Sequence, residues 1–131
     1  MKYIELTSNA YNKDFKIAAD NIAVMWYSIY DDTTVISLKH GFYKDQNTLK
    51  VNQTIEEIES MLRSIKNKIL YIELTSNVYN TDFKIAADNI AAMWYSIYDD
   101  TTVISLKHGF YKDHNTFKVN QTIEEIEAMV R

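Results

Sequence analysis

Two adjacent carboxylates, Asp31-Asp32, recur in the second half of the chain as Asp99-Asp100. Paired carboxylates can bind a metal ion or exchange a proton, provided that both side chains converge on one point. Neighbouring residues on an extended strand point to opposite faces, so the two side chains of each pair diverge. Two aspartates before a run of β-forming residues are typical of a hairpin turn. We therefore predict two turns, and we retain all four aspartates as residues that contact a partner.

Histidine offers no stronger case for catalysis. His40 and its copy His108 each precede a glycine, with no second histidine nearby in the sequence to complete a ligand pair. His114 matches Gln46 in the other copy, an exchange that a catalytic or metal-binding role would not tolerate. The chain contains no Ser-His-Asp order, glycine-rich phosphate loop or HExxH stretch. We expect no enzymatic activity, no cofactor and no metal.

Adjacent aromatic residues provide a better candidate for binding. Phe42-Tyr43 and the copy Phe110-Tyr111 lie in a polar connection. Two neighbouring aromatic rings do not both fit into one small core, so one ring of each pair is expected to be exposed and to contact a protein partner. The alternative is that both rings fold back over the mouth of the domain.

The elements that position these residues occur twice. Residues 3–63 and 71–131 align over 61 positions and differ at seven. We therefore expect a first repeat over 1–65, a linker over 66–70 and a second repeat over 71–131. A unit of this size is marginally stable alone, so each repeat is expected to pack against the other or against a second chain. The differing pairs are Ala10/Val78, Lys13/Thr81, Val24/Ala92, Gln46/His114, Leu49/Phe117, Ser60/Ala128 and Leu62/Val130.

Two of these differences suggest compensation. Alanine at position 10 becomes valine at 78, while valine at position 24 becomes alanine at 92. If the two positions touch, the exchange conserves volume, which cores tolerate best. We interpret it as repacking within one core.

Each repeat is predicted to contain five short antiparallel strands and one helix. Period-two alternation and flanking turn residues mark the strands. The fold class is α+β, mainly β: a bent five-stranded antiparallel sheet or a small SH3-like barrel, with a C-terminal helix. In the first repeat the expected strands cover 3–7, 15–17, 22–30, 34–39 and 48–51.

The closing helix has the clearest local signal. Thr54 and Glu57 form a capping box, in which the threonine hydroxyl accepts a hydrogen bond from the Glu57 amide and the glutamate side chain returns one. The apolar residues that follow recur at helical spacing, so we expect one face of the helix to cover the sheet. They are Ile55, Ile58, Met61, Leu62 and Ile65.

The third strand is apolar on both faces, which is unusual for a sheet covered on one side. We predict that the helix covers one face of this strand and that the other repeat covers the second. The alternative is that the second face binds an outside protein, since Tyr, Trp and Met are enriched at interfaces. The short linker requires neighbouring repeats, which we expect to mimic a two-fold homodimer. The expected inter-repeat residues are Met25, Tyr27, Ile29, Met93, Tyr95 and Ile97.

Three segments carry a resemblance to a known family: FKIAADNI, TTVISLKHG and LKVNQTIEEI. They resemble the small FlbD/SwrD-like family of flagellar and swarming-motility proteins, which combines short strands, a glycine turn and a glutamate-rich closing helix. The resemblance covers most of each repeat. It implies the same fold and a role as a motility or regulatory accessory protein.

Composition narrows the class of protein. The net charge of −4 argues against nucleic-acid binding through a basic surface. No apolar run approaches the length of a membrane span, and the N-terminus has no signal core. Cysteine is absent, as in many proteins of reducing compartments. We expect a cytoplasmic protein that binds no membrane.

These observations favour a non-enzymatic protein-binding or inhibitor module with two equivalent surfaces. Its expected partner is a bacterial host protein or complex, because the bias toward Lys, Asn, Ile and Tyr resembles AT-rich bacterial genomes and their phages. The corresponding role is a phage or mobile-element anti-defence protein, of the anti-CRISPR kind. The alternatives are the motility role and a small-ligand binder with a pocket between the repeats, walled by Trp26 and Trp94.

Overall fold

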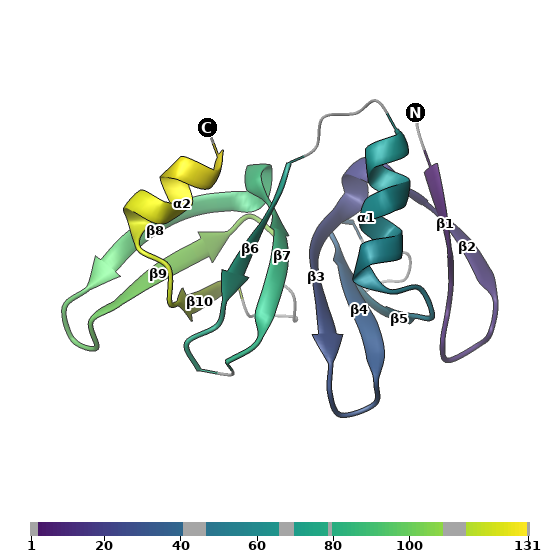
Figure 1. Cartoon of the computed structure of the whole chain (residues 1–131), viewed down its shortest axis with the longest axis horizontal. Coiled ribbons are helices and arrows are strands. Elements are labelled where there is room, and N and C mark those ends of the chain that lie inside the picture. The colour runs from purple at the N-terminus through teal and green to yellow at the C-terminus, as the bar shows by residue number, and fades with distance from the viewer. Residues whose placement is uncertain (1–2, 41–46, 66–69, 79, 109–114, 131) are drawn as a thin grey trace.

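The computed structural model describes residues 3–40, 47–65, 70–78, 80–108 and 115–130 (Figure 1). It is mainly antiparallel β-sheet with two α-helices, as predicted. The first repeat contains β1 (Tyr3–Thr7), β2 (Asp14–Ala18), the 3-10 helix η1 (Ala19–Asn21), β3 (Ile22–Ser28), β4 (Thr33–Leu38), β5 (Thr48–Val51) and α1 (Ile55–Ser64). The second contains β6 (Tyr71–Thr75), β7 (Asp82–Ala86), η2 (Ala87–Asn89), β8 (Ile90–Ser96), β9 (Thr101–Leu106), β10 (Thr116–Val119) and α2 (Ile123–Val130).

Within the first repeat, backbone bonds connect the β1–β2 hairpin to β5. Ser8 bridges Val51 in antiparallel register. The Asn9 amide donates to the Lys50 carbonyl at 2.9 Å, and the Asn52 amide donates to the Thr7 carbonyl at 2.9 Å. The strands of this repeat therefore follow each other in the order β2, β1, β5, β4, β3, which leaves β2 and β3 at the two ends.

A bulge at the start of β3 decides which side chains face which core. The register with β4 shifts between Ile22 and Val24, so the side-chain alternation reverses there. Ile22 and Met25 are buried in the core of the first repeat, whereas Val24 and Trp26 are buried in the core of the second. Strict period-two counting along this strand places residues 22, 24 and 26 on one face, and it fails here because it ignores the extra residue.

The repeats are joined by the antiparallel pairing of β3 with β7. We call this contact the seam; its register is Val24↔Ile85, Met25↔Lys84 and Trp26↔Phe83. It produces one five-stranded sheet, in the order β5-β4-β3-β7-β6, that runs through both repeats at the centre of Figure 1.

Aromatic contacts continue from the seam into the second core. The Trp26 and Phe83 rings meet edge to face with centroids 5.6 Å apart. Phe83 meets Phe117 in the same way at 5.5 Å. Phe117 replaces Leu49 of the first repeat, so this difference extends the aromatic packing behind the seam.

The expected two-fold interface containing residues of both third strands was wrong. A two-fold interface would pair matching surfaces, but the seam joins β3 of one repeat to β7 of the other, which is a heterologous contact. Met25 is fully buried, yet it packs in the core of its own repeat. Met93 is partly buried and packs against the core of the second repeat. The other expected residues are exposed: Tyr27 (45%), Ile29 (76%), Tyr95 (52%) and Ile97 (78%).

Both closing helices are present with their predicted capping boxes. The Thr54 hydroxyl accepts from the Glu57 amide at 3.1 Å, and the Glu57 carboxylate accepts from the Thr54 amide at 2.8 Å. Ile58 is fully buried and Leu62 is 8% exposed, so the predicted apolar face covers the first core. Thr122 and Glu125 repeat the same two bonds at α2.

The proposed exchange of volume between two differing pairs was wrong. Val24 is fully buried at the seam, but Val78 is 65% exposed and Ala10 is also exposed. These positions therefore share no core in which volume could be conserved. The Val24/Ala92 difference follows the environment instead, because β3 is covered by β7 whereas Ala92 lies exposed on β8.

Candidate functional site

The most exposed apolar side chains of the described structure lie at the ends of two equivalent hairpins. We define the hairpin tips as residues 29–32, between β3 and β4, and 97–100, between β8 and β9. Ile29 and Tyr30 are 76% and 95% exposed, and Ile97 and Tyr98 are 78% and 95% exposed. The two tips have the same sequence, Ile-Tyr-Asp-Asp, so they present the same chemistry twice.

The first aspartate of each tip fastens the turn to the neighbouring strand. The Asp31 carboxylate accepts hydrogen bonds from the Lys50 ammonium and, at 2.9 Å, from the Thr33 hydroxyl. These bonds, that to Lys50 foremost, together with one from Ser28, lower the pKa of Asp31 to about 2. The carboxylate therefore stays ionised at neutral pH, and side chains of its own repeat already bind it.

The second aspartate fixes the aromatic ring behind the tip. The Tyr27 hydroxyl donates to the Asp32 carboxylate, and this bond is the main cause of the raised pKa of Tyr27. Asp32 has a φ of 54°, in the left-handed region that aspartate tolerates in turns.

The second tip repeats this arrangement. Its first aspartate accepts hydrogen bonds from a lysine and a threonine. Its second accepts a hydrogen bond from a tyrosine and has the same φ of 54°. The residues involved are Tyr95, Asp99, Asp100, Thr101 and Lys118.

The prediction that both aspartate pairs form turns is confirmed. Each carboxylate of the first pair points to a different partner, Lys50 or Tyr27, so the two do not converge on one ion. Within the described residues, no three His, Asp or Glu side chains come together in a way that could hold a metal ion.

A groove of about 750 Å³ lies between the repeats beside the first tip. Tyr27, Ile29 and Asp32 line it from the first repeat, and Lys84 lines it from the second. The predicted tryptophan walls lie elsewhere. Trp26 is buried in the seam against Phe83, and Trp94, 46% exposed, lies on β8.

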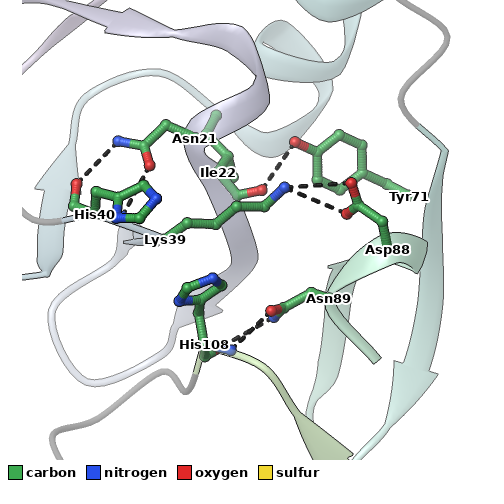
Figure 2. A network of polar contacts seen from close by, with 8 residues as sticks. All are labelled: Asn21, Ile22, Lys39, His40, Tyr71, Asp88, Asn89 and His108. Atoms are coloured by element: carbon green, nitrogen blue, oxygen red, sulfur yellow. Dashed lines mark hydrogen bonds and ion pairs between the residues drawn. The ribbon is translucent and has the colours of Figure 1, made fainter. Parts of the chain in front are cut away.

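Sequence reasoning missed a polar cluster that the seam assembles. The His40 and His108 rings lie 5.5 Å apart by their centroids (Figure 2). Lys39 of the first repeat also forms an ion pair with Asp88 of the second, at 3.3 Å. The two histidines are 68 positions apart and occupy equivalent positions in the two repeats. Their recurrence was the only feature of the sequence that could have indicated the cluster, because the β3–β7 pairing is what brings them together.

Matching asparagines hold the two histidine backbones in place. The Asn21 side chain accepts from the His40 amide at 2.9 Å and donates to its carbonyl at 3.0 Å. Asn89 makes the same two bonds to His108, both at 2.9 Å (Figure 2). These bonds therefore fix the backbone from which each imidazole extends and do not involve the rings.

This cluster predicts a pH-dependent stability. Burial lowers the pKa of His108 from its ordinary value of 6.5, and the positive charges of His40, Lys39 and Lys107 lower it further against the opposing effect of Asp88. The unfolded chain then takes up a proton at a higher pH than the folded chain does. We expect the free energy of unfolding to fall as pH drops below 6.5 toward the lower folded pKa, with no such loss above 6.5.

Urea denaturation across that pH range tests the prediction. His108→Gln keeps the backbone that Asn89 binds but removes the titrating ring, so its stability should change less with pH than that of the wild type. Equal pH slopes for the two proteins would contradict the assignment.

The predicted aromatic pairs Phe42-Tyr43 and Phe110-Tyr111 lie outside the described residues, as do Gln46 and His114. Four of the five expected linker residues, 66–69, lie outside them too.

Comparison of the chain with models of protein families, with curated proteins and with solved structures gave no match. The resemblance to the FlbD/SwrD-like family therefore stays a prediction. In the described segments, neither helix is long and apolar enough to cross a bilayer.

Proposed function

We propose that this chain is a non-enzymatic protein-binding module that acts through its two hairpin tips. The observation that carries the proposal is the duplicated tip: an isoleucine and a tyrosine, each more than three-quarters exposed, on a turn held by aspartate bonds. Exposed apolar side chains gathered on a structured loop are characteristic of interaction sites.

The bonding behind each tip supports this proposal energetically. Tyrosine is among the residues that dominate binding energies, since its large ring is buried at low entropic cost. Asp31 and Asp32 anchor the turn before any partner arrives, so less ordering remains to be done on binding.

Duplication gives the module two equivalent sites. The tips belong to repeats joined by a continuous sheet, so their separation is set by the seam. Two linked sites bind a dimeric or repetitive partner far more tightly than either site alone, by a factor of about 10²–10⁴. We propose a bacterial host protein or complex as the partner and inhibition of a defence system by a phage or mobile element as the role, a choice that rests on composition.

Capture of proteins from bacterial lysates tests the proposal, using the intact chain and tip variants as baits. Tyr30→Ser combined with Tyr98→Ser should abolish capture, because loss of an aromatic hot spot weakens binding roughly 30-fold or more at each site. Either single substitution should weaken capture of an oligomeric partner by removing avidity.

Tyr11→Ser is the matched control, since Tyr11 is 74% exposed but lies on another turn. A specific partner should be retained by this control and lost by the double variant. Recovery of the same proteins by the double variant and the wild type would contradict the tips as the binding surface.

A further inference from the structure

The seam uses two surfaces, and each of them exists a second time in the molecule. β3 corresponds to β8, and β7 corresponds to β2, because the repeats align with a constant offset. We define the β8 edge as residues 92–94 and the β2 edge as residues 15–17. Among the described residues, β8 pairs only with β9, and β2 pairs only with β1. Among the described strands, each edge therefore lacks the neighbouring strand that its counterpart has in the seam.

Burial differs between the copies as these open edges require. Trp26 is 7% exposed in the seam, while its copy Trp94 is 46% exposed. Phe83 is 4% exposed in the seam, and its copy Phe15 is only partly buried. The β8 strand contains no charged residue, proline or glycine that would discourage pairing with another strand.

The charged groups that flank the seam also recur at the open edges. Lys84 forms an ion pair with Glu59 of helix α1 at 3.2 Å, across the seam. Their copies are Lys16 on the β2 edge and Glu127 on helix α2, and both are exposed.

Two more polar contacts between the repeats also have exposed copies. The Lys39–Asp88 ion pair has the exposed copies Lys107 and Asp20. The Tyr71 hydroxyl donates to the Ile22 carbonyl at 3.1 Å, and its copy Tyr3 is 56% exposed.

We propose that the β8 edge of one molecule binds the β2 edge of a second copy of this chain, in the geometry of the seam. The register would be Ala92↔Ile17, Met93↔Lys16 and Trp94↔Phe15, with Lys16 of one molecule paired to Glu127 of the other. Five of the six residues in this register are identical to their counterparts in the seam, and the sixth, Ala92, stands where the seam has Val24.

The assembly is head to tail. The β1–β2 hairpin and the β8–β9 hairpin lie at opposite ends of the molecule (Figure 1), so the two edges of one chain face different neighbours. Such a heterologous contact adds molecules into a closed ring or an open filament, and each added molecule contributes two further repeats. Its register includes neither Tyr30 nor Tyr98, so the Tyr30→Ser/Tyr98→Ser variant should assemble like the wild type.

Sedimentation velocity of the full chain across a wide concentration range tests the proposal. We expect the wild type to reach masses of two or more chains, where one chain is 15.4 kDa. Trp94→Lys should weaken self-association roughly tenfold or more, because it places a charge where a tryptophan must be buried. A wild type that stays monomeric at all concentrations would overturn the proposal.

A charge exchange tests the register. Lys16→Glu and Glu127→Lys should each weaken assembly, since they bring like charges together at the contact. An equimolar mixture should recover it, because each open edge then meets an opposite charge on the other variant. Failure of the mixture to recover, or assembly that responds to Trp94→Lys but to neither charge variant, would overturn the pairing of β8 with β2.

Discussion

Replacing Trp26 with alanine is expected to lower the free energy of unfolding by about 3–5 kcal/mol, the range found for large aromatic residues removed from a core. Trp26 is 7% exposed, packs edge to face on Phe83 and lies in the strand pair that joins the repeats. Its loss leaves a cavity that the surrounding β-sheet can close only in part. Urea denaturation monitored by far-ultraviolet circular dichroism measures the change.

The repeat supplies a matched control for this substitution. Trp94 occupies the same position in the second copy but is 46% exposed on the β8 edge. Trp94→Ala should therefore destabilise a dilute, monomeric sample much less than Trp26→Ala does, because little buried surface is lost. Equal destabilisation by the two variants would contradict a seam formed by β3 and β7.

Replacing Ile58 with alanine is expected to lower the free energy of unfolding by about 2–5 kcal/mol. Ile58 is the fully buried residue of helix α1 and joins the helix to the core of the first repeat. Thr54→Ala, which removes the capping-box acceptor, should cost only about 1 kcal/mol. Thermal and urea denaturation of both variants measure whether packing contributes more than the cap.

Ser60→Ala provides the control on the same helix. Residue 60 is exposed, and the second repeat has alanine at the equivalent position 128, so this change should stay within about 0.5 kcal/mol of the wild type. A larger effect of Thr54→Ala than of Ile58→Ala would mean that the helix is held mainly by its own end, against the packing described above.

Local signals predicted the secondary structure well. The predicted strand 48–51 agrees with β5, and the Thr54 capping box marks the start of α1. Strand β3 ends at Ser28, two residues before the predicted end, where the chain enters the tip. These features depend on neighbours within a few residues, so one repeat contains all the information they need.

The candidate site could be predicted only in part. The four aspartates were expected to contact a partner, and the structure places them at the hairpin tips. Ile29 and Ile97 were expected in a buried contact between the repeats, yet both are highly exposed, and Ile29 lines the open groove between them. Alternation along an apolar strand does not show where the strand leaves the sheet, so it could not show that these residues are exposed.

The sequence by itself determined three features of this protein: the duplication, the five strands and one helix of each repeat, and the aspartate turns. The duplication follows from the identity of the two repeats, and the other two follow from short-range chemistry. Which strands join the repeats was decided only by the tertiary structure. Two nearly identical repeats can pair through matching strands or through different ones, and the repeat pattern alone does not distinguish the two. The bulge between Ile22 and Val24 turns Val24 and Trp26 toward the second repeat, where Phe83 and Ile85 of β7 cover them. That long-range packing makes the copies unequal: it buries Trp26, leaves Trp94 exposed and brings His40 to His108.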